Sequence, residues 1–216
     1  MSHQSRLVLI RHGESIYNEK NLFTGWEDVE LTQRGIGQAH AAANLIQDID
    51  FTHAFTSKLK RARNTLDIIL KDLNQYMVVT ENRALNERDY GSLVGKNKLH
   101  AAEKYGKEQV QLWRRSYSNP PPDGESLEMT AKRSIPYYQT RIEPLLKGDN
   151  KVIVSAHGNS IRSIIMYLHN LDSEQILKTE IGWCEPWIYT FTDGIQTEFK
   201  IVPRTDSESK SHLPNT

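Results

Sequence analysis

The sequence has 216 residues, and 27 lysines and arginines balance 27 aspartates and glutamates, so its formal net charge at pH 7 is zero. With 38% hydrophobic and 25% charged residues it has the composition of a globular protein, long enough to bury a core without disulfides or a structural metal. The balanced charge argues against a nucleic-acid or membrane-surface binder, because such proteins attract their partners through a basic surplus.

Cysteine usage and the lack of long apolar runs indicate a cytoplasmic protein. Cys184 is the only cysteine, which excludes an intramolecular disulfide. The apolar run Leu7–Ile10 is too short for the core of a signal peptide. No window approaches the run of about 18 apolar residues that a transmembrane helix needs. We therefore expect a cytoplasmic protein with no membrane partner.

Short apolar strands alternate with helical patterns along the chain. In chain order we expect a strand at 7–10, a helix at 32–46, a strand at 53–56, a helix at 60–73, a strand at 77–80, helices at 101–117 and 125–146, a strand at 151–156, a helix at 160–169, and edge strands at 187–191 and 198–202. Thr32 is a plausible N-cap, Gly106 breaks one helix and Pro136 bends another. This alternation predicts a layered α/β domain with a largely parallel sheet.

The chain shows no internal repeat and no long low-complexity linker. The turn at Pro120–Gly124 lies between two helical patterns, so we interpret it as a loop of one fold. Residues 204–216 are rich in Ser, Lys, Asp and Pro, a composition typical of mobile tails. We therefore expect a single domain over residues 1–203 and a flexible C-terminal tail over residues 204–216.

Two histidine–glycine pairs follow the two strongest strand patterns. His12-Gly13 follows the first strand and His157-Gly158 follows the strand at 151–156, where parallel sheets bind their ligands. Neither histidine has a metal-ligand spacing. Arg11 and Arg61 would add guanidinium groups that match phosphate geometry. Because neutral imidazole is a nucleophile, these residues predict a phosphoryl-transfer pocket.

Longer segments carry a resemblance to a known family. They are Leu7–Asn18, Asn21–Trp26, Thr56–Ala62, Leu85–Gly91, Trp113–Arg115 and Ala156–Ser160. In this order, over roughly residues 7 to 171, they resemble the cofactor-dependent phosphoglycerate mutases of the histidine phosphatase superfamily. The resemblance implies a three-layer α/β/α fold with a mostly parallel sheet, and mutase activity on phosphoglycerate. It also implies 2,3-bisphosphoglycerate as the priming cofactor, no metal, a small-molecule substrate and no nucleic acid. A homodimer is one oligomeric state that it leaves open.

The resemblance also implies a role for each site residue. His12 would become phosphohistidine, and Glu87 would be the general acid and base. The transferring phosphoryl group would be held by Arg11, Arg61 and His157, with Asn18 and the Gly158 backbone close by. The remaining expected site residues are Ser15, Thr24, Gly25 and Asn159 along the substrate, and Tyr90, Lys98, Arg114 and Arg115 at its carboxylate and second phosphate.

Other interpretations of the same residues remain open. Glu87 could be a surface carboxylate paired with Arg88, Arg114-Arg115 a solvated helix face, and Lys98 an ordinary exposed lysine. Alternative functions are a phosphatase of the same superfamily, a bisphosphoglycerate mutase and a non-catalytic phospholigand binder. The short loop at 120–126, the segment Gly182–Pro186 and the short tail depart from the family pattern. They bear on how well water is excluded, and therefore on the ratio of transfer to hydrolysis.

Overall fold

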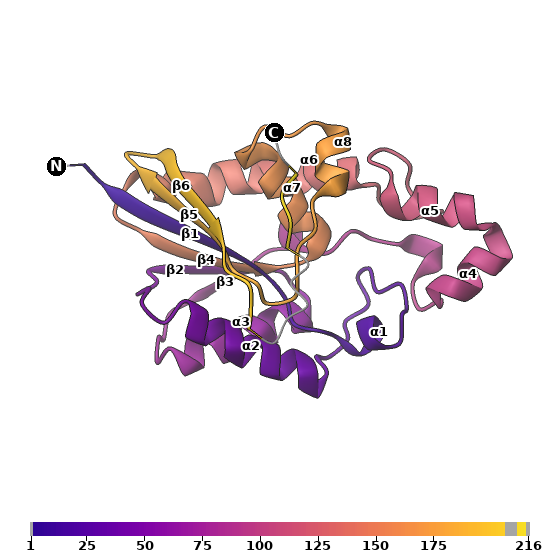
Figure 1. Cartoon of the computed structure of the whole chain (residues 1–216), viewed down its shortest axis with the longest axis horizontal. Coiled ribbons are helices and arrows are strands. Elements are labelled where there is room, and N and C mark those ends of the chain that lie inside the picture. Colours follow the sequence, from indigo (N-terminus) through magenta and orange to yellow (C-terminus); the bar gives the residue numbers. More distant parts are fainter. Residues whose placement is uncertain (1, 206–210, 215–216) are drawn as a thin grey trace.

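The computed structural model describes residues 2–205 and 211–214. Within this part of the chain one sheet has the strand order β3-β2-β4-β1-β5-β6 (Figure 1). The strands are β1 (Gln4–Arg11), β2 (His53–Thr56), β3 (Val79–Glu81), β4 (Lys151–Ala156), β5 (Trp187–Thr192) and β6 (Ile195–Ile201). Strands β3, β2, β4 and β1 pair in parallel, whereas β5 pairs antiparallel with both β1 and β6. The predicted mostly parallel sheet is confirmed.

Helices cover both faces of the sheet and complete the predicted three-layer α/β/α fold (Figure 1). They are α1 (Ile16–Glu19), α2 (Gln33–Leu45), α3 (Lys60–Asp72), α4 (Lys98–Tyr105), α5 (Lys107–Arg115), α6 (Leu127–Tyr137), α7 (Gly158–Leu168) and α8 (Ser173–Lys178), with short turns η1 (Arg83–Leu85), η2 (Gly91–Leu93), η3 (Tyr138–Ile142) and η4 (Glu143–Lys147). On one face of the sheet, α2 and α3 pack against the strands and form one hydrophobic core. On the other face, α6 and α7 pack against the strands and form a second core.

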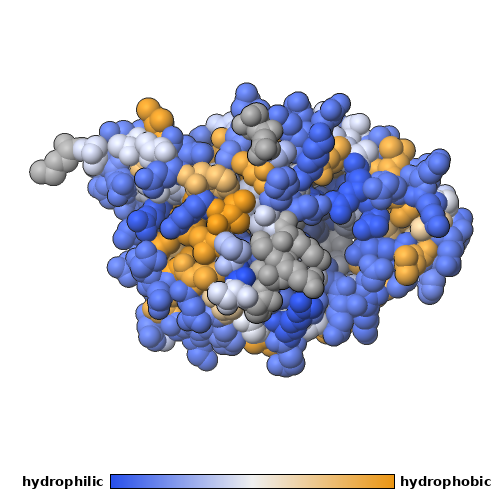
Figure 2. Space-filling model, in the orientation of Figure 1, coloured by the Kyte–Doolittle hydropathy of each residue, from blue (hydrophilic) through white to orange (hydrophobic). Residues whose placement is uncertain are grey.

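Strand β1 shows why its sequence is apolar at every position. Leu7 and Leu9 belong to the core under α6 and α7, whereas Val8 and Ile10 belong to the core under α2 and α3. Side chains alternate between the two faces of a strand, so a strand covered on both faces needs a continuous hydrophobic run. Figure 2 shows a mostly hydrophilic surface, with one hydrophobic patch over the strands and smaller ones over α4 and α5.

Helices α4 and α5 extend the molecule beyond the carboxyl ends of the parallel strands (Figure 1). They have a small core of their own, formed by Phe23, Leu93, Ala101 and Val110. Gly106 separates the two helices with a φ of 88°, which confirms the predicted break. This arrangement places the C-terminal end of α5, which carries Arg114 and Arg115, beside the strand ends that carry the histidine–glycine pairs.

Two predicted elements differ in kind from the structure, and the short helices α1 and α8 were not predicted. The strand at 187–191 is not an edge strand, because β5 lies between β1 and β6 and buries Trp187 completely. The helix at 125–146 is not one bent helix: α6 ends at Tyr137, since Pro136 removes a backbone donor, and the wider turn η3 and the tighter turn η4 follow. Helix α8 was not predicted, although Asp172 and Gln175 form a capping box at its start.

Position 35 requires glycine, because α2 closely approaches the turn that carries His12 at this point. A Cβ atom on Gly35 would lie 2.1 Å from the carbonyl oxygen of Glu14. On Gly37, in the same helix, it would meet nothing within 4 Å. We expect Gly35→Ala to lower the free energy of unfolding by about 2–4 kcal/mol, because backbone must shift. Gly37→Ala should raise it by roughly 0.5–1 kcal/mol through helix propensity. Urea denaturation measures both, and equal effects would contradict the packing argument.

The predicted tail falls partly on residues 206–210 and 215–216, which lie outside the described residues. Its described part contacts the body: Ser211 Oγ accepts from the Gly182 amide at 2.9 Å, and His212 forms a β-bridge with Glu180. The division of the chain at residue 203 stays a prediction. None of the helices described for residues 2–205 and 211–214 is long and apolar enough to cross a membrane.

Candidate active site

His12 and His157 meet at the carboxyl ends of the adjacent strands β1 and β4. Their ring centroids are 5.0 Å apart, and both side chains are buried. His12 Nδ1 lies 2.6 Å from the carbonyl oxygen of Gly13. Because a carbonyl can only accept, Nδ1 carries the hydrogen and Nε2 is left with a free lone pair. The neighbouring glycine therefore selects the tautomer in which the Nε2 lone pair is free to act as a nucleophile.

Burial and the neighbouring positive charges keep both imidazoles neutral. Burial, and then the guanidinium groups of Arg61 and Arg11, hold the pKa of His12 well below its usual value of 6.5. Burial and Arg61 lower the pKa of His157 in the same direction. A neutral ring at neutral pH is the form that can attack phosphorus.

Backbone carbonyls fix the two arginines that face the histidines. Arg61 donates from Nη1 to Glu27 O at 2.9 Å and from Nη2 to Gly25 O at 2.8 Å. Arg11 donates from Nη1 to Ile181 O at 2.8 Å, and its guanidinium lies 5.3 Å from the Trp183 ring centroid. Burial lowers the pKa of Arg61 to about 10, so it stays charged at neutral pH.

Unused donors remain beside these fixed charges. The Nε atoms of Arg11 and Arg61 are buried and have no hydrogen-bond partner among the described residues. Gly158 opens α7, so its N–H has no partner within the helix. A buried unpaired donor costs free energy unless a ligand satisfies it. These groups therefore fit an anion with several oxygen atoms.

Glu87 is held at the start of α7 with one carboxylate oxygen committed and the other available. Oε1 accepts from the Asn159 amide at 3.1 Å, from Asn159 Nδ2 at 2.9 Å and from the Arg88 amide at 2.8 Å. The side chain of Arg88 instead bonds to Tyr90 and to the Arg114 carbonyl. The alternative in which Glu87 is a surface carboxylate paired with Arg88 is therefore wrong.

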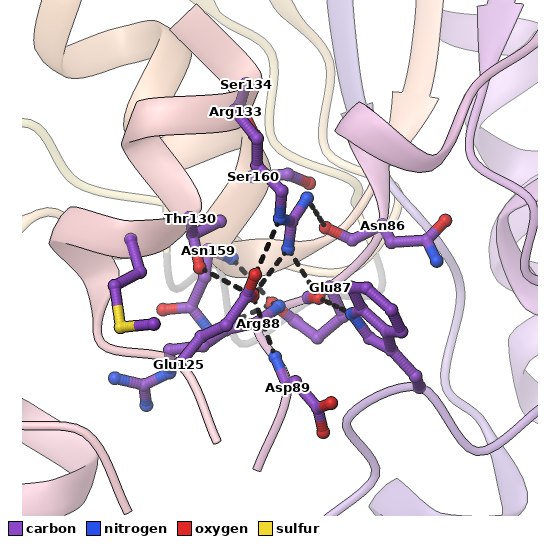
Figure 3. Close-up of polar contacts among 12 residues, drawn as sticks. Asn86, Glu87, Arg88, Asp89, Glu125, Thr130, Arg133, Ser134, Asn159 and Ser160 are labelled. Atoms are coloured by element: carbon purple, nitrogen blue, oxygen red, sulfur yellow. Dashed lines mark hydrogen bonds and ion pairs between the residues drawn. The ribbon is translucent and has the colours of Figure 1, made fainter. Parts of the chain in front are cut away.

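A partly buried ion pair supports the segment that carries Glu87 (Figure 3). Arg133, on α6, donates to the carbonyl oxygens of Asn86 and Glu87 at 3.0 and 2.9 Å. Glu125 accepts from Arg133 at 2.9 and 2.7 Å, and from the Asp89 amide at 3.1 Å. The network ties both sides of Glu87 to one helix, so it fixes the direction in which the carboxylate points.

These groups line or underlie one cavity of about 170 Å³. The predicted residues on its wall are Arg11, Asn18, Thr24, Gly25, Glu87, Tyr90, Lys98, Arg114, Arg115, Gly158 and Asn159. His12, Arg61 and His157 are more deeply buried beside it. Ser15 differs from the expectation: it is the N-cap of α1, and its hydroxyl donates to Asn18 Oδ1 at 2.8 Å instead of lining the cavity.

The outer part of the cavity carries a second group of cations. Arg114 and Arg115 end α5, and Lys98 begins α4. Burial lowers the pKa of both Lys98 and Arg114. Tyr90 also lies on this wall, and it accepts from Arg88 Nη2 at 2.8 Å. Residues distant in sequence therefore form a positive region next to Glu87, which a neutral total charge does not reveal.

Two charged residues of the cavity were not expected from the sequence. Arg162 lies three positions after Asn159 on α7, a spacing that places both on one helix face and could have identified it. Glu180 follows α8 and lies between Arg115 and Arg162, at 2.8 and 3.0 Å. No motif in the sequence marks Glu180, because its position depends on the tertiary fold.

The sequence matches the histidine phosphatase superfamily (branch 1) over residues 7–200. The chain belongs to this superfamily. It is 50% identical to the 2,3-bisphosphoglycerate-dependent phosphoglycerate mutase of Cytophaga hutchinsonii, covering 88% of this chain and 89% of that protein. The same identity relates it to the mutase of Parvibaculum lavamentivorans, with 92% and 97% covered.

Solved structures of this superfamily share the fold. A mycobacterial hydrolase aligns with a TM-score of 0.79 and 25% identity, covering 94% of this chain and 98% of the hydrolase. A phosphoglycerate mutase from Bacillus anthracis aligns with a TM-score of 0.77 and 25% identity, covering 93% of each chain. The fold therefore occurs in proteins named as hydrolases and as mutases, and the side chains of the cavity must distinguish between the two.

The buried histidines of this member of the histidine phosphatase superfamily give its stability a defined pH dependence. Below about pH 6.5 the unfolded chain binds protons on His12 and His157 that the folded chain excludes. The free energy of unfolding should therefore fall on acidification below pH 6.5, by at most about 1.4 kcal/mol per pH unit for each histidine. Denaturation at several pH values should give a shallower slope for His157→Gln and an unchanged slope for the exposed control His100→Gln. Equal slopes in all three proteins would contradict this.

Proposed function

We propose that this chain is a 2,3-bisphosphoglycerate-dependent phosphoglycerate mutase, which interconverts 3-phosphoglycerate and 2-phosphoglycerate in glycolysis and gluconeogenesis. The observation that carries the proposal is the second cation group, Lys98, Arg114 and Arg115, in the same cavity as Arg11 and Glu87. A phosphoglycerate carries two anionic groups, a carboxylate and a phosphate, and a hydroxyl group that receives the phosphoryl group in the isomerisation. Hydrolysis of a simple phosphate ester needs only one of these cation groups.

In the proposed mechanism His12 is the phosphoryl carrier. Its Nε2 forms the new N–P bond while the P–O bond to the donor oxygen breaks. Arg11, Arg61 and His157, with Asn18 and the Gly158 amide, then stabilise the charge on the transferring oxygens. Such fixed donors lower the barrier because they do not reorganise during the reaction. The carrier subsequently gives the group to one hydroxyl of the bound acid and accepts another from the adjacent position.

Glu87 moves the proton in each transfer. Its Oε1 is saturated by Asn159 and Arg88, so Oε2 is the atom that faces the substrate hydroxyl. A Cβ atom on Gly158 would lie 3.8 Å from this Oε2 and 3.6 Å from Arg11 Nε. The glycine therefore leaves open the space in which a phosphoryl oxygen and a hydroxyl can lie between the two groups.

The cations of the outer wall orient the substrate. Arg114, Arg115 and Lys98 bind its carboxylate and second phosphate, while Tyr90, Thr24, Gly25 and Asn159 shape the wall around it. Holding both ends of a small acid limits it to the orientations in which a hydroxyl meets Glu87 and His12.

The cation groups and the unpaired donors of Arg11 and Arg61 also fit 2,3-bisphosphoglycerate. When bound, this compound supplies the phosphoryl group that primes His12. We expect no metal to be required, since the protein's cations neutralise the phosphoryl charge. A cytoplasmic location follows from the proposed place in glycolysis, and a homodimer stays a prediction.

The test compares transfer with hydrolysis. The protein is primed with 2,3-bisphosphoglycerate and given 3-phosphoglycerate, and 2-phosphoglycerate and free phosphate are measured together. We expect isomerisation to exceed phosphate release. Dominant phosphate release would favour the phosphatase alternative, dominant formation of 2,3-bisphosphoglycerate the bisphosphoglycerate mutase, and no reaction the non-catalytic binder.

A further inference from the structure

Glu180 places a second negative charge on the wall of a cavity that must bind anions. Glu87 and Glu180 are the carboxylates among the described residues that line this cavity. Glu87 has a role in proton transfer, whereas Glu180 makes its contacts with cations. Its Oε1 accepts from Arg115 Nη1 at 2.8 Å and its Oε2 from Arg162 Nη2 at 3.0 Å. Glu180 therefore competes with an anionic ligand for the guanidinium groups of Arg115 and Arg162.

The surrounding backbone keeps this carboxylate at the wall. The Glu180 amide donates to His212 O at 2.9 Å, and the His212 amide donates back to Glu180 O at 2.8 Å. Arg162 is anchored by a hydrogen bond from Nε to Thr179 O at 2.8 Å. Since the backbone is bridged on one side and Arg162 is fixed on the other, the charge of Glu180 stays in place when a ligand enters.

The field of Glu180 extends across the cavity. The pKa of Arg11 is lowered by burial, and it is raised first by Glu87 and next by Glu180. A carboxylate that acts on Arg11 also acts on a phosphate bound there. Its repulsion grows with the charge of the ligand, and a second phosphate adds roughly 1.5 to 2 negative charges at neutral pH. A doubly phosphorylated ligand is therefore opposed more strongly than a singly phosphorylated one.

We propose that Glu180 determines the charge selectivity of this cavity, by weakening the binding of 2,3-bisphosphoglycerate more than that of 3-phosphoglycerate. The inference rests on the proposed function. Without Glu180 the cations lining the cavity, Arg11, Lys98, Arg114, Arg115 and Arg162, would favour the ligand of highest charge, which would then leave slowly. With Glu180 the cavity binds the bisphosphate and still releases it in exchange for substrate.

Calorimetric titration tests this in the His12→Ala background, where neither ligand reacts. Full-length protein is titrated with 3-phosphoglycerate and with 2,3-bisphosphoglycerate. Glu180→Gln should lower Kd about threefold for the first and about tenfold for the second, a difference that shrinks at high salt. Glu180→Asp keeps the charge and should leave the ratio of the two Kd values unchanged. Glu174→Gln, an exposed carboxylate on α8 outside the cavity, is the control and should also leave it unchanged.

Each other outcome has a distinct meaning. If Glu180→Gln weakens both ligands, Glu180 serves to hold Arg115 in place, and the inference is wrong. An equal change for both ligands, or no change, also overturns it. If the background protein binds neither ligand, the proposed function fails and this inference fails with it, whereas normal binding with an unchanged ratio rejects the inference alone.

Discussion

Replacement of His12 by alanine is expected to lower mutase turnover by at least about 10⁴-fold, because it removes the covalent carrier itself. The neighbouring His157 is engaged differently, since its Nε2 lies 2.7 Å from Ser57 Oγ. Arg11 and Arg61 remain, so the variant should still bind 3-phosphoglycerate. Stopped-time assays of 2-phosphoglycerate formation measure the loss.

The control for this variant is His100→Ala, which removes an exposed imidazole on α4 and should leave turnover unchanged. Circular dichroism and titration with 3-phosphoglycerate establish that the His12 variant folds and binds. Turnover above about 1% of the wild-type rate in a folded, ligand-binding His12→Ala protein is incompatible with a covalent route through this residue.

Glu87→Gln should have the second-largest effect, a fall in kcat of about 10²–10⁴-fold with little change in KM. Glutamine has the same shape, so its oxygen can still accept from Asn159 and Arg88 as Oε1 does. It cannot accept and return a proton, so only the chemical steps slow. Steady-state kinetics in both directions measure this split between kcat and KM.

Glu103→Gln, an exposed carboxylate on α4, is the matched control and should behave as wild type. Urea denaturation of Glu87→Gln should give a midpoint close to that of the wild type, because the supporting ion pair of Arg133 and Glu125 bonds to the backbone and not to the Glu87 side chain. A variant that keeps normal kcat would remove Glu87 from the proton-transfer role.

The sequence was sufficient for the elements whose pattern is local. The strands at 53–56 and 151–156 have the bounds predicted for them, and Thr32 caps α2 through a hydrogen bond to the Gly35 amide. Periodicity could not reveal that Trp187 lies in an interior strand, since that depends on β6 adding outside β5. Gly35, which weakens a helix by propensity alone, is explained only by its contact with Glu14.

The residues of the candidate site also fall into two groups, those that the sequence motifs identified and those that only the structure revealed. His12, His157 and Glu87 stand in motifs, and the structure brings them to one cavity. Ser15 belongs to the same motif as His12, yet its hydroxyl is used to cap α1. Arg133 and Glu180 lie outside the motifs and act through tertiary contacts with Glu87 and Arg115. Motifs therefore identified the candidate reacting groups, and the structure was needed for the groups that position them and balance their charge.

The most direct test of the central claim is to locate the phosphoryl group on the protein. The protein is incubated with 2,3-bisphosphoglycerate, and the acid-labile phosphohistidine is mapped by mass spectrometry and ³¹P NMR. The hydrogen bond from Nδ1 to Gly13 predicts phosphorylation of His12 at Nε2, and no label on His12→Ala. Label on another residue, label at Nδ1, or a protein that stays unlabelled would contradict the account.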